Sequence, residues 1–201
     1  MSKKLLLHSC CGPCSISAVK HLRENFWDPS AFFYNPNIHP EDEYRKRLQA
    51  ISELCEKVNM PLIIYGGYGM NVFLENLSHL DLKSSILQSH KKASIKEHRC
   101  AMCYEIRLEE AARFARDNAY QFFTTTLLYS KHQNHDLIRQ IAEEKAKKHH
   151  VQFVYVDFRE FWEEGQAESR EMGLYRQKYC GCIFSKQDRK AAKEKKAAAV
   201  S

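Results

Sequence analysis

Short apolar runs alternate with longer amphipathic stretches along most of the chain. A short apolar run between polar or turn-forming residues predicts a buried strand, and apolar residues that recur at helical spacing predict one face of a helix. The predicted strands are residues 5–7, 31–34, 61–65, 121–124 and 152–156. The predicted helices are residues 13–22, 41–58, 72–77, 99–117, 134–149 and 160–172.

This alternation predicts an α/β fold, in which a parallel sheet carries helices on both of its faces. Ligands bind such sheets beyond the carboxyl ends of the strands. Residues 8–15 follow the first predicted strand, and residues 34–40 follow the second. We therefore expect these two segments to line one crevice.

The length of 201 residues and the hydrophobic content of 44% favour one core over two equal domains. We expect a single domain over residues 1–189, in which residues 66–98 form a helical or irregular insertion. Residues 190–201 are rich in alanine and lysine and are expected to form a basic tail. Because no secretory signal and no bilayer-spanning apolar run is visible, we expect a cytoplasmic protein without membrane contact.

The chain carries a formal net charge of +6. Basic residues concentrate in the C-terminal segment and at the end of the helix predicted over residues 134–149. Such residues can form an ordinary solvated surface or complement a helix C-terminus, and they also suit a polyanionic partner. The charge therefore permits a nucleic-acid partner without establishing one.

Seven of the eight cysteines fall into three groups. The groups are Cys10-Cys11-Gly12-Pro13-Cys14, Cys100-Ala101-Met102-Cys103 and Cys180-Gly181-Cys182. Cys55 stands apart on the apolar face of its predicted helix, where a thiol packs as a small hydrophobic group. Because disulfides are rare in a reducing cytoplasm, the clustered thiols predict a metal site.

The spacing within the groups can bring sulfur atoms together. Cys100 and Cys103 are one turn apart near a helix N-terminus, where the helix dipole favours the thiolate. Gly181 lets the chain bend so that Cys180 and Cys182 approach one centre. Two thiolate pairs would fill one tetrahedral zinc site, whereas seven cysteines suit an iron-sulfur cluster with thiolates to spare. Spacing therefore favours an iron-sulfur cluster over zinc and over thiol redox chemistry.

Four ordered sequence strings are similar to a known family. They are LLHSCCGPCS at residues 6–15, YNPNIHP at 34–40 with Glu43, Tyr44 and Arg47 after it, RCAMCYEIRL at 99–108, and YRQKYCGC at 175–182. From about residue 4 to residue 189 the chain resembles the QueH family of epoxyqueuosine reductases. The resemblance implies a fold similar to the nucleotide-binding fold of enzymes that thiolate tRNA, with a metal-binding segment near the C-terminus.

The resemblance also implies a reaction, the last step of queuosine synthesis. Epoxyqueuosine at the wobble position of tRNA would be reduced to queuosine without cobalamin, by a 4Fe-4S cluster and an additional mononuclear iron. The implied partners are the tRNA anticodon loop and an external electron donor. Cys14 is an expected metal ligand, and the other expected ligands are Cys10, Cys11, Cys100, Cys103, Cys180 and Cys182.

Loss of the epoxide oxygen as water needs protons, which side chains near the predicted crevice must hold. The candidates are His39, Tyr44, Tyr104 and Tyr175, although each could simply pack with its polar tip outward. His8 could bind the metal itself or donate a hydrogen bond to a metal-bound sulfur, and we favour the hydrogen bond. Five arginines are expected to contact RNA phosphate or to hold the loops together: Arg45, Arg47, Arg99, Arg107 and Arg176. The aromatic rings suited to stacking on an unstacked base are Tyr34, Tyr44 and Tyr175.

Two alternatives remain open from the sequence. One is a zinc-stabilised RNA-binding module without turnover, which chelation would unfold. The other is an iron-sulfur-dependent tRNA thiolation enzyme, which would need ATP and leave a thio-base.

Overall fold

A sheet of parallel strands forms the centre of the computed structural model, which describes residues 2–80 and 94–198. The strand order is β3-β2-β1-β4-β5, and every neighbouring pair is parallel. The strands are β1 (Lys3–His8), β2 (Trp27–Phe33), β3 (Leu62–Ile64), β4 (Phe122–Thr125) and β5 (Gln152–Phe153). The predicted parallel sheet is confirmed.

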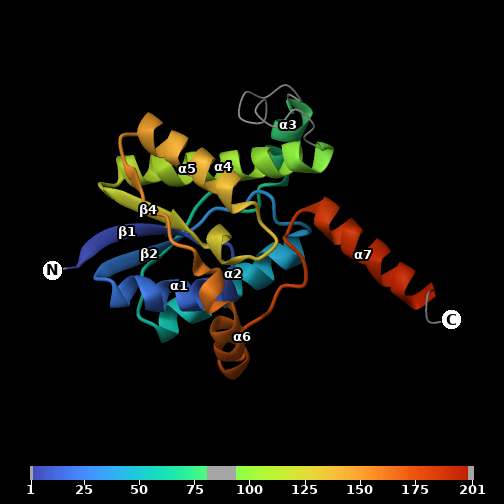
Figure 1. Ribbon diagram of the computed structural model, residues 1–201, viewed down its shortest axis with the longest axis horizontal. Helices are drawn as coiled ribbons and strands as arrows, with labels where there is room; N and C mark the ends of the chain where they lie inside the picture. Colours follow the sequence, from blue (N-terminus) through green and yellow to red (C-terminus); the bar gives the residue numbers. More distant parts are fainter. Residues whose placement is uncertain (1, 81–93, 199–201) are drawn as a thin grey trace.

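Helices cover both faces of the sheet, as predicted (Figure 1). One face carries α1 (Gly12–Glu24), α2 (Glu41–Lys57) and α6 (Trp162–Glu171). The other face carries α4 (Ile95–Asp117) and α5 (His135–Lys148). The remaining helices are α3 (Met70–Ser78), α7 (Ile183–Ala198) and the 3₁₀ turns η1 (Thr126–Tyr129) and η2 (Phe158–Phe161).

The strand order places a topological switch between β1 and β4. The chain proceeds from β1 outward through β2 to β3, and then returns to add β4 and β5 on the other side of β1. In open parallel sheets, such a switch point opens a crevice beyond the carboxyl ends of the strands. Cys10 follows β1 and Thr126 follows β4, and the backbone N–H of Cys10 donates to the Thr126 hydroxyl oxygen at 3.1 Å. The first cysteine group therefore lies at the switch point.

Local sequence explains the close approach of α1 and α2. Pro13 sits in the first turn of α1, where its missing N–H costs no helical hydrogen bond. A Cβ atom at Gly12 would come within 2.4 Å of the backbone oxygen of Ala50 in α2, so only glycine permits this contact. The first turn of α2 is acidic, which complements the positive end of the helix dipole.

Several element boundaries differ from the predicted ones. Helix α4 begins at Ile95 rather than at residue 99, because Ser94 and Glu97 form a capping box that satisfies the free N–H groups of the first turn. Strand β2 begins at Trp27, whose mixed polar surroundings hide the strand from a search for apolar runs. Strand β5 is shorter than predicted and ends at Phe153.

The predicted insertion and tail are only partly described. Helix α3 matches the short helix predicted over residues 72–77, and residues 81–93 of the insertion lie outside the described residues. The predicted boundary between residues 189 and 190 falls inside helix α7, which the apolar pattern did not reveal. Within residues 2–80 and 94–198, no helix has both the length and the apolar character needed to cross a membrane.

Candidate metal centre and active site

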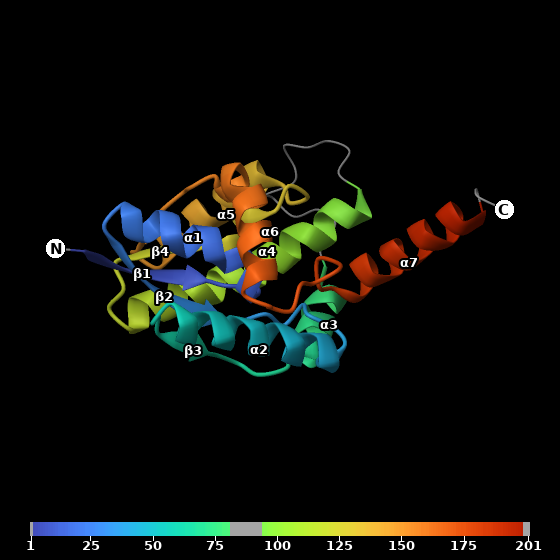
Figure 2. The ribbon, with the colours of Figure 1, turned by 90° about the horizontal axis from the view of Figure 1, so that it is seen from below.

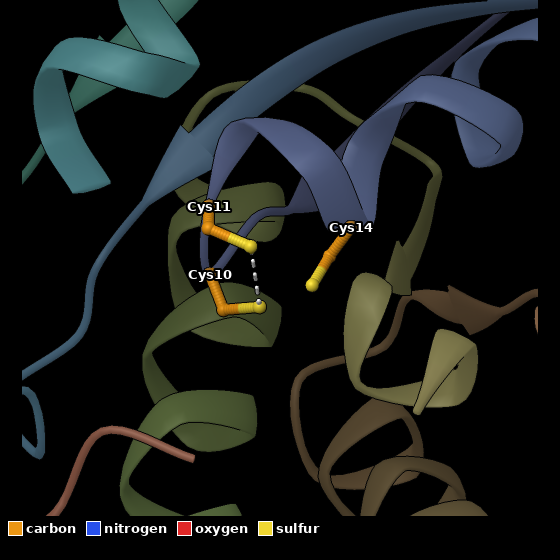
Figure 3. Close-up of side chains that lie close together, drawn as sticks. All are labelled: Cys10, Cys11 and Cys14. Carbon is orange, nitrogen blue, oxygen red and sulfur yellow. Dashed lines mark hydrogen bonds between the residues drawn. The ribbon is translucent and has the colours of Figure 1, made fainter. Parts of the chain in front are cut away.

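Three thiols converge just beyond the end of β1. The sulfur atoms of Cys10, Cys11 and Cys14 all lie within 4.8 Å of one another, and those of Cys10 and Cys11 are 3.8 Å apart. Figure 3 shows the three sulfur atoms directed toward one another from the start of α1 and the residues before it. Cys11 and Cys14 are buried and Cys10 is partly buried. No other group of this kind occurs among the described residues, which include all eight cysteines.

The three cysteines differ in how readily their thiols lose a proton. Hydrogen bonds from Cys11 and Cys14 hold the pKa of Cys10 well below its usual value, against the effect of burial. Burial raises the pKa of Cys11, and the hydrogen bond to Cys10 adds to this effect. The pKa of Cys14 is raised first by its hydrogen bonds to Cys10 and Cys11. The geometry thus stabilises one thiolate, which is the form of cysteine that binds metals.

This donor set fits a thiolate-bound metal. Two sulfur atoms that share one tetrahedral ion through bonds of about 2.3 Å lie about 3.8 Å apart. The 3.8 Å separation of the Cys10 and Cys11 sulfur atoms matches that value. Soft thiolate ligands select iron-sulfur clusters, zinc or copper(I) over hard cations such as magnesium.

The other four cysteines of the predicted groups lie on α4 and on the segment before α7. Cys100 and Cys103 are on one face of α4, and Cys182 packs against the cluster that contains Cys103. The pKa of Cys100 is raised to about 11 and that of Cys103 to about 12, mainly by burial and in part by charge repulsion from Cys180 and Cys182. These four thiols therefore interact electrostatically, and their common ligation of iron stays a prediction.

A buried ion pair holds the Cys180 segment in place. Arg47 and Glu43, one turn apart on α2, are 1% and 6% exposed and bond at 2.8 Å. Arg47 also donates to the carbonyl oxygens of Tyr179 and Cys180, both at 2.9 Å. A second acceptor oxygen of Glu43 receives the hydroxyl proton of Tyr175 at 2.6 Å. Arg47 thus acts as a clamp, and its burial rules out direct contact with RNA phosphate.

A second buried arginine stands among the thiols. Arg107 is 2% exposed and donates from Nε to the Cys103 carbonyl oxygen at 2.9 Å and from Nη2 to the Cys103 sulfur at 3.2 Å. Burial alone would lower the pKa of Arg107, but Cys103, Cys180 and Cys10 raise it overall. Its charge therefore acts on members of all three cysteine groups. Like Arg47, it holds the site rather than RNA.

Two glutamine amides and one hydroxyl also lie within hydrogen-bond distance of cysteine sulfur atoms. Gln177 donates from Nε2 to the Cys14 sulfur at 2.9 Å, and Gln133 donates to the Cys180 sulfur at 3.2 Å. The Thr126 hydroxyl lies 3.5 Å from the Cys10 sulfur. Hydrogen bonds of this kind tune thiolate ligands and the metals they hold. Gln133 and Thr126 lie outside every predicted motif.

Two of the four predicted proton carriers have a buried polar atom that makes no hydrogen bond to the described residues. The His39 Nε2 atom and the Tyr44 hydroxyl are buried and find no hydrogen-bond partner among the described residues. The other nitrogen of His39 lies 3.2 Å from the Tyr68 hydroxyl, and burial lowers the pKa of the His39 imidazole. His39 is thus held neutral on the segment that follows β2.

The other two predicted proton carriers are already engaged. Tyr104 donates its hydroxyl proton to Gln133 Oε1 at 2.5 Å, and Tyr175 donates to Glu43. Burial raises the pKa of both phenols, and Glu43 raises that of Tyr175 further. Both hydroxyls serve the network that orients the cysteine segments.

His8 does not meet its prediction. Its Nε2 donates to the Tyr34 carbonyl oxygen at 3.2 Å, so Nδ1 of the neutral ring accepts from the Thr125 hydroxyl at 2.8 Å. Burial, followed by the charge of Arg107, lowers the His8 pKa to about 4. Both ring nitrogens of His8 are therefore hydrogen-bonded. They link β1 to β4 and to the residue that follows β2, and neither bonds to a sulfur.

The remaining predicted residues lie at the periphery of the site. Arg45 pairs with Glu41 on the surface of α2, Arg176 bonds to Gln166, and the Arg99 guanidinium lies 3.8 Å from the centre of the Phe184 ring. Cys55 is buried in the main core, and burial raises its pKa to about 12, as expected for a packing thiol.

Comparison with known proteins identifies a family for this chain. The family model described as epoxyqueuosine reductase QueH matches residues 5–188. Epoxyqueuosine reductase QueH of Dehalococcoides mccartyi is 34% identical over 94% of this chain and 96% of its own length. The Thermotoga maritima protein of the same name is 33% identical over 92% of each chain.

A solved structure shares the fold at much lower identity. It is a predicted subunit of tRNA methyltransferase from Methanocaldococcus jannaschii, with a TM-score of 0.51 and 11% identity over 84% of this chain and 76% of that chain. This likeness concerns the α/β fold alone. The family model matches most of the chain, and the two relatives match it over nearly their whole length. The chain therefore belongs to the QueH epoxyqueuosine reductases, which are oxidoreductases of tRNA processing in queuosine biosynthesis.

Proposed function

We propose that this chain reduces epoxyqueuosine to queuosine at the wobble position of tRNA, using cysteine-bound iron and no cobalamin. The observation that carries the proposal is the buried group of Cys10, Cys11 and Cys14 at the topological switch point of the sheet. We further propose that the seven grouped cysteines hold a 4Fe-4S cluster and a neighbouring mononuclear iron. For an enzyme that acts on tRNA, we also propose a cytoplasmic location.

The reaction sets the demands on the site. Conversion of an epoxide to an alkene breaks two C–O bonds, consumes two electrons and two protons, and releases the oxygen as water. An external low-potential electron donor supplies the electrons. Bound iron would supply single-electron transfer and a Lewis acid for the epoxide oxygen. The side chains must then orient the substrate, exclude water and hold the protons.

His39 and Tyr44 are the proposed proton carriers. His39 lies on the segment that follows β2, and the Tyr44 ring of α2 packs 5.4 Å from the ring of Phe33, the last residue of β2. Each has a buried polar atom without a partner among the described residues. A neutral imidazole and a phenol can each pass a proton to a developing alkoxide within hydrogen-bond reach. Tyr104 and Tyr175 contribute by holding Gln133 and Glu43 in place.

The modified base must leave the anticodon stack to reach this site. Tyr34, half-buried after β2, is the proposed stacking surface, since its ring sits beside that of Tyr65 in a wall of aromatic side chains. Stacking on one aromatic ring contributes about 1–3 kcal/mol per base.

The test is an anaerobic assay with tRNA that contains epoxyqueuosine, a strong reductant and nucleoside analysis of the digested product. We expect queuosine, which has one oxygen fewer, from the iron-loaded wild type and from the Cys55→Ala control, and none from Cys10→Ala. Unchanged epoxyqueuosine with iron-loaded wild type would overturn the proposal. A thio-base formed only with ATP would instead identify a sulfur-transfer enzyme.

A further inference from the structure

Helix α7 is the element least supported by the rest of the molecule. None of its residues from Ile183 to Ala198 is buried. Figures 1 and 2 show from two directions that it projects away from the sheet and its covering helices. It begins directly after Cys182, so it is continuous with a cysteine segment of the proposed metal site. Because none of its residues is buried, core packing does not explain the residue composition of this helix.

Basic residues form a stripe along one side of α7. They occur at helical spacing and fall within an arc of about 120°, given 3.6 residues per turn. The five residues, called the basic stripe below, are Lys186, Arg189, Lys190, Lys193 and Lys196. The sixth basic residue of the helix, Lys195, lies on the opposite side with Asp188.

The contacts of α7 turn the basic stripe toward solvent. Lys96 of α4 pairs with Asp188 at 3.7 Å, and Arg99 of α4 stacks on the ring of Phe184. Phe184 and Asp188 are four residues apart and lie on the side of α7 opposite the centre of the stripe. Helix α4 therefore contacts the side of α7 opposite the basic stripe, and the stripe faces outward.

The charge of the basic stripe is largely uncompensated. In the part of the chain that the structure describes, Lys190 is the one member with an ion pair, to Glu194 at 3.9 Å, and both side chains are well exposed. Exposed pairs of this type contribute little free energy. Lys186, nearest the body of the protein, lies within electrostatic reach of Asp42 on α2. The outer members, Arg189, Lys193 and Lys196, remain available to a polyanion.

We propose that the basic stripe binds the sugar-phosphate backbone of the tRNA whose modified nucleotide occupies the site. This inference rests on the proposed function and adds the docking surface. From Lys186 to Lys196 the stripe extends about 15 Å, given the rise of an α-helix, and starts four residues beyond Cys182. The opposite side carries Phe184, which Arg99 of α4 covers, together with alanine, Asp188 and Lys195. It offers no broad apolar face, so insertion into a lipid surface is disfavoured.

The stripe also lies mostly beyond the shared family region. The family model ends at residue 188, so Arg189, Lys190, Lys193 and Lys196 are outside it. The inferred contact therefore rests on this chain's own residues and not on the family match.

The helix supplies its own matched control. Lys193→Gln and Lys195→Gln remove the same charge from the same exposed helix two residues apart, with glutamine preserving helix propensity. Full-length iron-loaded proteins are compared for tRNA binding by fluorescence anisotropy across a series of salt concentrations. Circular dichroism checks that each variant keeps its helix content.

The expected result is a difference in salt dependence. Each lost phosphate contact lowers the slope of log K against log salt by about 0.7–0.9. Lys193→Gln should show this loss, Lys195→Gln should keep the wild-type slope, and the triple variant Arg189→Gln/Lys193→Gln/Lys196→Gln should lower the slope by about 2–3. Equal slopes for Lys193→Gln and Lys195→Gln, or wild-type affinity in the triple variant, would overturn the inference.

Two further readouts separate this inference from the proposed function. If wild type binds tRNA through the stripe but yields no queuosine, the proposed function fails and the docking surface stands. If wild type yields queuosine while the triple variant binds tRNA normally, the docking surface fails alone. Loss of binding to phosphatidylserine vesicles in the triple variant, with tRNA affinity unchanged, would also overturn the inference and assign the stripe to membranes.

Discussion

Gln177 donates a hydrogen bond to the sulfur of Cys14 over 2.9 Å, and its own carbonyl oxygen is buried with no partner among the described residues. The amide therefore gives up a hydrogen bond on one side to place its N–H against the sulfur on the other. An amide N–H beside a cysteine stabilises the thiolate and any metal bound to it. This relationship makes Gln177 a positioning residue for Cys14.

Replacement of Gln177 by leucine should weaken metal retention. Loss of a hydrogen bond to a ligand typically costs about 10–100-fold in metal affinity or activity. We expect Gln177→Leu to lose iron to a chelator faster than wild type, as measured by the decay of visible absorption. Gln49→Leu, on the exposed surface of α2, is the control and should match wild type. Identical decay in both variants would remove Gln177 from the site.

Gly181 is held in a backbone conformation that other residues rarely adopt. Its φ is 136°, and a Cβ there would come within 3.2 Å of Asn37 and Ile38. Gly173 also has a positive φ, of 68°, but a Cβ there would meet nothing within 4 Å. From backbone strain, Gly173→Ala should lose about 1–2 kcal/mol and Gly181→Ala about 1–3 kcal/mol. We expect only Gly181→Ala also to lose iron, because the displaced turn carries Cys180 and Cys182. Normal iron content in Gly181→Ala would show that the turn tolerates movement.

The contacts of Arg47 with Glu43 and with the Cys180 segment should raise the melting temperature of the protein. Removal of one partner from a buried ion pair leaves an uncompensated charge and costs about 3–5 kcal/mol. For a chain of this size, we expect Arg47→Met to lower the melting temperature by about 10 °C, measured by anaerobic calorimetry. Arg47→Met/Glu43→Gln should recover part of the loss because it removes the orphaned carboxylate. A double variant no more stable than the single would contradict this account of Glu43.

Two buried cysteines separate ligation from packing. Cys14 and Cys55 are 6% and 4% exposed, yet only Cys14 has other thiols nearby. We expect Cys14→Ala to lose iron on anaerobic purification, as measured by elemental analysis. Cys55→Ala should keep its iron and lose no more than about 2 kcal/mol, since it removes a small packing group. Equal iron content in the two variants would refute the role of Cys14.

The sequence predicted the fold and the cysteine groups because both leave local signals. Buried strands such as Leu5–Leu7 read as apolar runs, and the three cysteine groups are visible as spacing. The capping box at Ser94 and Glu97 was also readable and would have placed the start of α4 correctly. Helix α7 was missed because its regular positions are basic instead of apolar, which a search for apolar periodicity ignores.

The contacts that hold the site left no such signal. Gln177 meets Cys14 across 163 positions of sequence, and Tyr175 meets Glu43 across 132. Both contacts form only when distant parts of the chain fold together. A glutamine or tyrosine beside a cysteine motif can have many other partners, so the sequence does not predict these two. The hydrogen-bond partners of His8, Tyr104 and Tyr175 could not be predicted for the same reason, because a polar tip near a crevice does not reveal its partner.

The central claim is that the grouped cysteines hold iron. Metal and acid-labile sulfide content, measured with the visible spectrum of anaerobically purified wild type, tests it most directly. We predict about 4 or more irons per chain and broad absorption near 400 nm, as cluster chemistry requires. A colourless protein that holds stoichiometric zinc after anaerobic reconstitution would contradict the claim.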